Sequence, residues 1–284
     1  MKEKDTAAFL SVVAAIALTT MKLIVGLLTG SLGVLSEALH SALDSLAAGM
    51  TWFAVKFSDK PADAEHPFGH GKMENLSALI ESALLIGTCF WVVYEATLRL
   101  YQGTEMFSLN VWAFVVIIVS IVVDFFRARH LHKMAKKYNS QALEADALHF
   151  STDILSSFVV LLGLVGSAFG YYFADCVAAL GVSVIVLWVS GRLAYKAVNA
   201  LIDTAPEGMI DKIESIVKSV EGVEQCHDVR VRSSGAEYEI DVNIHVKSTL
   251  TIVQAHDISE NVENAIRTEL GSCGVITIHT EPDC

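Results

Sequence analysis

Six long apolar segments are the feature that most constrains this chain of 284 residues. They cover approximately residues 7–29, 31–57, 77–101, 108–130, 142–169 and 172–202. A helix that crosses a bilayer needs roughly 20 predominantly apolar residues, and each segment provides that length. The composition agrees, because 53% of the residues are hydrophobic, only 18% are charged and the mean hydropathy is +0.48. We therefore expect an all-α bundle of six membrane-spanning helices within residues 1–205.

Charge and cysteine content exclude two classes of protein. The net charge of −12 argues against a nucleic-acid partner, which would need a basic surface. The five cysteines include no C-x-x-C pair, so a disulfide scaffold is not expected. We expect all five to be free thiols: Cys89, Cys176, Cys226, Cys273 and Cys284.

Positively charged residues near the ends of the spans predict the orientation in the membrane. Lysine and arginine gather after the fourth segment and between the second and third, whereas residues 30–33 and 166–174 contain none. Such residues mark the cytoplasmic side of a membrane protein. We therefore expect a multi-pass protein of the cell (inner or plasma) membrane with both termini in the cytoplasm.

Residues 206–284 have the pattern of a small soluble α+β domain. Helical periodicity covers 208–220 and 251–270, and strand-like alternation covers 226–232, 238–246 and 274–279. The order α-β-β-α-β predicts a small sheet with two helices on one face. This domain contains 15 acidic and six basic residues, which is typical either of a solvated surface or of a domain that attracts cations.

Two of the predicted spans contain a histidine and an aspartate four residues apart: His40 with Asp44, and His149 with Asp153. Residues at this spacing project from one face of a helix, and ionisable groups inside a membrane are costly enough to need a role. Two facing helices would bring two imidazoles and two carboxylates to one point, a donor set that suits tetrahedral Zn²⁺. A single pair is equally explained by a buried hydrogen bond between helices. The repetition of the pair favours a metal site.

Other ionisable residues in the spans are expected to pair between helices or to lie at span ends: Lys22, Glu81, Glu95, Asp124 and Asp175. Glu37 precedes His40 by three residues on the same stripe of the helix, and we expect it on the approach to the metal site.

The link after the second span contains Asp63, His66 and His70 among turn-forming residues. Pro67 and Gly69 permit tight turns that would let the three side chains converge. The pattern D-x-x-H-x-x-x-H predicts a second metal site, and an ordinary surface loop explains it equally well.

Four histidines of the acidic tail lie near predicted element ends: His227, His245, His256 and His279. Glu281 follows two residues after the last of them. These side chains would form a third metal site if they gather, although each alone is explained as an exposed surface histidine.

These motifs together resemble the cation diffusion facilitator family over nearly the whole chain. They are S-L-G-V-L-S-E-A-L-H-S-A-L-D in the second span, H-P-F-G-H-G-K after it, A-D-A-L-H-F-S-T-D in the fifth span, and H-D-V-R-V-R-S-S-G and Q-A-H in the tail. The resemblance implies a homodimer in the lipid bilayer that exports divalent metal, most often Zn²⁺, in exchange for protons. Cd²⁺, Fe²⁺ and Mn²⁺ are alternative ions. It also implies a metallochaperone-like fold for the cytoplasmic domain, residues 206–284.

The resemblance also assigns roles by position. It implies a transport site (His40, Asp44, His149 and Asp153), a loop site (Asp63, His66 and His70) and a paired regulatory zinc site at the dimer contact of the tails (His227, His245, His256, His279 and Glu281). It implies a salt bridge between Lys72 and Asp203 that joins the spans to the tail. Two positions depart from the family pattern. Some bacterial members have Asp in place of His40, and the carboxylate at position 281 is often Asp, where this chain has Glu281.

Two rival functions make different demands on the sequence. An intramembrane metalloprotease would need H-E-x-x-H on a helix, and the sequence contains no such motif, so we do not expect an enzyme. A membrane-bound metal sensor without transport would explain the tail histidines. It would leave the ionisable pairs in two spans without a role.

Overall fold

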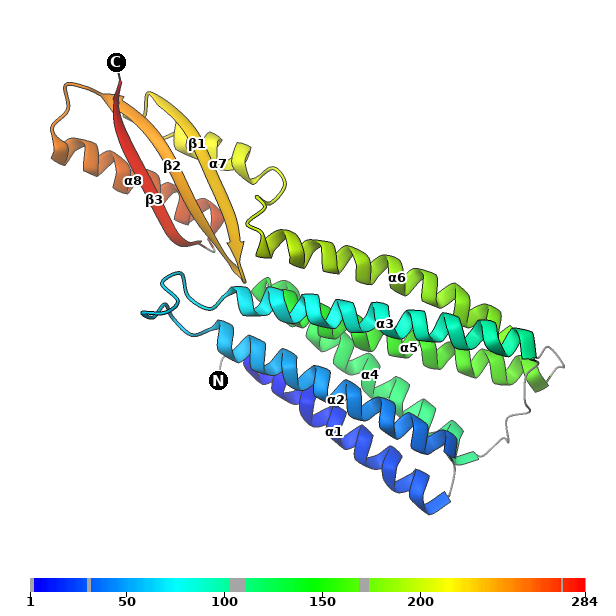
Figure 1. The fold of residues 1–284 in the computed structure, drawn as a ribbon. Helices are drawn as coiled ribbons and strands as arrows, with labels where there is room; N and C mark the ends of the chain where they lie inside the picture. Colours follow the sequence, from blue (N-terminus) through cyan, green and yellow to red (C-terminus); the bar gives the residue numbers. More distant parts are fainter. Residues whose placement is uncertain (1–2, 30–31, 103–110, 169–173, 272, 284) are drawn as a thin grey trace. The chain divides into compact units, whose positions relative to one another are not determined.

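The computed structural model describes residues 3–29, 32–102, 111–168, 174–271 and 273–283. Six long helices come first: α1 (Glu3–Thr29), α2 (Leu32–Ser58), α3 (Lys72–Gln102), α4 (Val111–Tyr138), α5 (Gln141–Ala168) and α6 (Ala174–Leu201) (Figure 1). They are followed by α7 (Met209–Lys218), β1 (Gln225–Ser234), β2 (Glu237–Lys247), α8 (Ile252–Leu270) and β3 (Cys273–Asp283). The predicted fold class, a six-helix region followed by an α-β-β-α-β domain, is confirmed.

The chain divides into two compact units. The helical unit contains Met1–Phe57 and Met73–Ala197, and the second unit contains Ser58–Lys72 and Val198–Cys284. The segment between α2 and α3, which we call the linker loop (residues 59–71), therefore packs with the α+β domain. The sequence analysis had placed that segment with the spans.

Small side chains form the interior of the helical unit. Its main buried cluster consists largely of alanines: Ala7, Ala8, Ala15, Ala48, Ala128, Ala135, Ala142 and Ala147. Small residues let helices approach closely, which is the usual way that helices pack in a bilayer. Large apolar side chains point outward instead, as shown by Leu28 at 82% exposure and Trp188 at 68%. This distribution fits a bundle whose outer surface contacts lipid.

Among the described residues, three helices are long and apolar enough to cross a membrane by length and composition: Glu3–Leu28, Lys72–Leu98 and Ala179–Leu201. Helix α2 is equally long, but His40 and Asp44 lower its hydropathy. Helix α5 carries His149, Asp153 and further acidic residues, including Glu144 and Asp146.

The α+β domain is a three-stranded sheet of order β1-β2-β3 with its core on the side of α7 and α8. Strand β2 pairs antiparallel with β1 and parallel with β3. Alternate residues of β2 are buried against both helices: Ile240, Val242, Ile244 and Val246. Because side chains alternate along a strand, the residues between them, including His245, lie on the opposite face of the sheet.

The described cysteines behave as predicted. Cys89, Cys226 and Cys273 are free thiols. Burial raises the pKa of the Cys226 and Cys273 thiols, which makes them poor nucleophiles and metal ligands. The side chains of Cys176 and Cys284 lie outside the described residues.

Candidate metal centres

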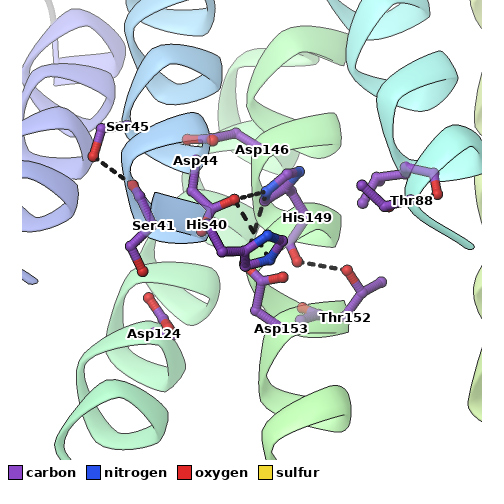
Figure 2. A network of polar contacts seen from close by, with 12 residues as sticks. His40, Ser41, Asp44, Ser45, Thr88, Asp124, Asp146, His149, Thr152 and Asp153 are labelled. Carbon is purple, nitrogen blue, oxygen red and sulfur yellow. Dashed lines mark hydrogen bonds and ion pairs between the residues drawn. The ribbon is translucent and has the colours of Figure 1, made fainter. Parts of the chain in front are cut away.

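Helices α2 and α5 bring three donor side chains together within the helical unit (Figure 2). His149 Nε2 lies 3.2 Å from Asp44 Oδ1 and 3.7 Å from Asp153 Oδ2. One ligand atom from each residue lies within 4.8 Å of the others. The Asp44 and His149 side chains are only 12% and 9% exposed, so their charges are largely withdrawn from water. One imidazole and two carboxylates at this spacing are donors that a borderline cation such as Zn²⁺ accepts.

His40, the fourth predicted ligand, lies at the edge of this group. Its Nε2 is 3.9 Å from Asp44 Oδ1, and its side chain is 50% exposed. Figure 2 shows its ring on the same side of α2 as Asp44, beside His149 and Asp153. His40 is therefore not part of the group whose ligand atoms all lie within 4.8 Å of one another.

A cavity of about 400 Å³ adjoins these donors. All six helices contribute to its lining, with Ala15, Asp44, Leu85, Ser120, Asp153 and Val186 among the lining residues. A water molecule occupies about 30 Å³ in the liquid, so the cavity has room for a cation with part of its hydration shell.

A buried polar network lies next to the candidate transport site. Ser11 donates to Asp146 Oδ2 over 3.0 Å, and Arg127 reaches both Ser11 and Asp124 over 3.1 Å. The Arg127 guanidinium also lies 3.5 Å from the ring centre of Phe150. Arg127 is itself buried. The side chains of Glu37 and Asp175 lie outside the described residues.

The linker loop brings Asp63, His66 and His70 together in a tight turn. Asp63 Oδ1 accepts hydrogen bonds from the backbone N–H groups of Glu65 (3.0 Å) and His66 (2.7 Å). The hydrogen bond from the His66 backbone is the main cause that lowers the pKa of Asp63. Asp63 Oδ2 lies 3.5 Å from His70 Nε2, and the two imidazole rings are 4.3 Å apart. The turn therefore holds a charged carboxylate next to two imidazoles, which is a second candidate centre.

The linker loop packs directly against the turn between β1 and β2. A Cβ atom on Gly71 would lie 2.5 Å from the Ser234 carbonyl oxygen, and one on Gly235 would lie 2.7 Å from the Gly71 oxygen. Gly235 also has a φ of +61°, a left-handed conformation that glycine adopts without steric cost. Both positions therefore need glycine, because two backbone segments meet there.

Polar contacts fasten the same loop to the α+β domain. Lys72 Nζ donates to Asp203 Oδ1 over 2.7 Å, and this hydrogen bond is the largest cause that lowers the pKa of Asp203. Arg232 on β1 contacts Asp203 at 3.4 Å and Glu239 on β2 at 2.6 Å. Its guanidinium lies 4.6 Å from the ring centre of Phe68 in the loop. Arg232 and Phe68 thus add to the Lys72–Asp203 pair, and the sequence analysis did not single them out.

A third candidate centre lies on the face of the sheet that the helices leave uncovered. His227 and His245 face each other through their Nε2 atoms, 3.1 Å apart. Glu281 Oε2 lies 3.3 Å from His245 Nε2 and 3.7 Å from His227 Nε2. Strand pairing explains the convergence. His245 on β2 lies opposite Glu281 on β3. His227 on β1 lies opposite Asn243, two residues before His245 on the same strand. A bound cation would satisfy both imidazole nitrogens and the carboxylate at once.

The remaining predicted tail ligands differ in their placement. His279 Nε2 lies 3.3 Å from the other oxygen of Glu281 and is within reach of the cluster. His245 also has Asp283 3.8 Å from its Nδ1, a residue that the sequence analysis did not consider. His256 stands apart on α8, where its side chain is 68% exposed and lies 3.5 Å from Glu260. The structure of one chain does not bring His256 to the other tail ligands.

Comparison with known proteins gives matches over the whole of this arrangement. The family model described as the cation efflux transmembrane domain matches residues 8–202, and that of the cation efflux protein cytoplasmic domain matches residues 205–283. The cation-efflux pump FieF of Salmonella arizonae is 34% identical over 281 residues, covering 97% of this chain and 92% of the relative. FieF of Salmonella schwarzengrund gives the same values.

Solved structures similar to the tail include MamM CTD variants. A nickel form is 24% identical and covers 28% of this chain and 100% of that one, with a TM-score of 0.27. A cadmium form has the same identity and TM-score and covers 28% of this chain and 98% of that one.

Proposed function

This chain belongs to the cation diffusion facilitator family, a family of divalent metal cation efflux proteins, and we propose that it exports Zn²⁺ from the cytoplasm in exchange for protons. The observation that carries the proposal is the convergence of Asp44, His149 and Asp153 beside a cavity shared by six helices. Imidazole and carboxylate donors in a four-coordinate arrangement match the preference of Zn²⁺. His40 supplies the fourth donor after a side-chain rotation.

Proton coupling follows from the chemistry of the same donors. Zn²⁺ binds neutral imidazole and ionised carboxylate, so loading the metal displaces any proton held between His149 and Asp44. On the outer side, a proton that returns to these groups weakens metal binding and favours release. Rocking of the helices around the site would expose it to each side in turn.

The tail cluster supports a regulatory role for zinc. His227, His245 and Glu281 form a donor set that is separate from the transport site and lies in the second unit. We propose that zinc bound there favours one arrangement of a homodimer, with His256 contributed between chains. A ligand shifts such an equilibrium only through different affinities for the two arrangements.

The proposed orientation places both termini and the tail in the cytoplasm of a cell membrane protein. It follows from the lysine and arginine distribution described above. A cysteine introduced within residues 30–33 should react with an impermeant reagent from outside intact cells. Labelling only after permeabilisation would reverse the orientation.

A flux assay separates transport from the alternative function, a metal sensor without transport. Purified protein in proteoliposomes, with a zinc dye and a pH dye, should move Zn²⁺ and protons in opposite directions. Asp153→Ala should abolish the Zn²⁺ flux, because it leaves the site with one carboxylate. The control is Asp257→Ala on the exposed surface of α8, which should keep the wild-type flux. Zinc binding by wild-type protein without any flux would support the sensor instead.

A further inference from the structure

Glu81 of α3 is a fully buried ionisable residue that takes no part in the three candidate metal centres. Its exposure is 0%. The Thr51 hydroxyl on α2 donates to Glu81 Oε1. Within the described parts of the chain, the second oxygen, Oε2, is buried and has no hydrogen-bond partner, and no cation forms an ion pair with the carboxyl group. The sequence predicts that Glu81 pairs between helices or lies at a span end. The described residues give it a hydrogen-bond partner on α2 and no ion pair.

The charged groups around Glu81 come chiefly from α5. Asp146 and His149 both act electrostatically on it, and Asp146 repels a negative charge at this position. Asp146 is in turn influenced by Arg127 of α4 and by Asp44 of α2. Arg127 thus compensates Asp146, whereas the group that favours a negative charge on Glu81 is the His149 imidazole, whose effect is smaller than those of burial and of Asp146. A buried carboxylate without such compensation takes up a proton instead of remaining charged.

Glu81 lies on the closed side of the candidate transport site. Its partner Thr51 is seven residues after Asp44, which is roughly 10 Å along α2 at about 1.5 Å per residue. Asp146 likewise precedes His149 by one turn of α5. Thr51 and Asp146 therefore both lie toward the same end of the helices, where α2 ends and α5 begins. We call this the linker end. The cavity described above is lined neither by Glu81 nor by Thr51 or Asp146, and on α3 it extends from Leu85 to Ala96.

We propose that Glu81 is a proton-binding site that controls closure of the linker end. With that end closed, the buried side chain is a neutral carboxylic acid whose carbonyl oxygen accepts from Thr51. When the helices separate there, water reaches the group, the O–H bond breaks, the proton passes to water and a carboxylate remains. Closure takes a proton back from the same side. This step rests on the proposed alternating access and is separate from proton exchange at the transport site.

A proton fits this position better than a second metal ion does. Asp146 is the other carboxylate nearby, and Arg127 beside it would repel a divalent cation. No group of three metal-ligating side chains that includes Glu81 occurs among the residues that the structure describes. A single proton on Oε2 removes the charge and supplies a donor where the structure leaves the oxygen without a partner.

The expected effect is a pH-dependent conformational equilibrium at the linker end. For one proton bound by the closed form and released by the open form, the closed-to-open ratio changes by up to about tenfold per pH unit. Glu81→Gln keeps the shape of the neutral acid and cannot ionise. This variant should therefore remain closed at every pH, and its ratio should lose that dependence.

The experiment is hydrogen–deuterium exchange on the metal-free full chain in lipid nanodiscs over a pH series, corrected for intrinsic exchange. In wild type, protection of α3 near Glu81 should fall as pH rises. Glu81→Asp, which keeps a carboxyl group, should retain the dependence. The matched control Glu95→Gln changes the same residue type on the same helix in the cavity lining and should also retain it.

A second measurement does not depend on the Gln variant. A carboxylic acid C=O band in the infrared spectrum of wild type should decrease as pH rises, and its frequency should shift in Glu81→Asp. The inference is overturned if Glu81→Gln follows the wild-type exchange profile, or if the band is unaffected by Glu81→Asp. It is also overturned if Glu81→Gln weakens Zn²⁺ binding while keeping the pH dependence, because Glu81 would then be a metal ligand. Failure of wild-type zinc flux would refute the proposed function by a separate readout.

Discussion

Replacement of Gly71 by alanine tests whether the linker loop is fastened to the α+β domain. The added Cβ would lie 2.5 Å from the Ser234 oxygen and 2.8 Å from its carbonyl carbon. Both are backbone atoms that cannot rotate away, and a comfortable carbon–oxygen contact needs about 3.3 Å. Gly71 does not have a left-handed φ, so alanine strains the contact without straining its own backbone.

The collision has a definite expected magnitude. Overpacking of this kind costs about 1–3 kcal/mol. Since each 1.4 kcal/mol is a factor of about ten, the docked form of the loop should become roughly 5- to 150-fold less favoured. Amide exchange in the β1–β2 turn, around Ser234 and Gly235, should accelerate accordingly in the full-length protein.

The control is Gly69→Ala in the same loop. Gly69 has a φ of +79°, so alanine strains the turn, but its Cβ would meet no atom closer than 3.9 Å. That variant should disturb the loop itself and leave exchange in the β1–β2 turn near the wild-type rate. If Gly71→Ala leaves the exchange of the turn unchanged, the loop is not held there and the reasoning is refuted.

Three further predictions follow from the other centres. His40→Asp should keep Zn²⁺ efflux measurable and raise Cd²⁺ efflux several-fold relative to it, because the larger ion gains most from an added carboxylate; equal Zn²⁺/Cd²⁺ initial-rate ratios in both proteins would contradict this. Asp203→Asn should destabilise loop docking by less than about 1 kcal/mol at neutral pH, as for exposed ion pairs. Lys72 lowers the pKa of Asp203, so the ion pair stabilises the docked loop fully at pH values above the ordinary aspartate pKa. This stabilisation is lost as the pH falls through the lowered pKa of Asp203. The amide exchange rates of wild type and variant should therefore converge in acid. His245→Ala should weaken zinc binding by the tail by about tenfold or more, roughly 1.4 kcal/mol, as measured by calorimetry. His256→Ala should weaken it by less. Equal losses of affinity in the two variants would show that His256 is a full ligand of the same site.

The fold was largely predictable because its signals are local. Apolar length defines the six helices, and alternation along residues such as Ile240, Val242 and Ile244 defines the strands. A spacing of four residues along a helix likewise predicts that His149 and Asp153 lie side by side. Each of these patterns lies within a single segment of the chain, so it can be recognised from the sequence alone.

Contacts between distant segments were not predictable in this way. Gly71 and Gly235 have the sequence context of ordinary turn residues, and only the structure shows that their backbones meet. His227, His245 and Glu281 were grouped by their placement near strand ends and by the family resemblance, whereas their convergence depends on the strand register. Glu81 was expected to pair between helices or to lie at a span end, because its burial without an ion-pair partner depends on where the cations of the other helices lie. A charge count cannot supply those positions.

The linker loop connects these findings through the covalent chain. It runs from the end of α2, which carries Asp44 and Thr51, to the start of α3, which carries Glu81. Any movement of α2 against α3 at the linker end must therefore change the span that this loop bridges. At the α3 end of this loop, Gly71 contacts the β1–β2 turn and Lys72 pairs with Asp203. Metal bound by Asp63, His66 and His70 would stiffen the same short segment. Under the proposed function, zinc bound in this loop would act on the separation of α2 and α3, and the proposed proton site Glu81 would respond to that separation.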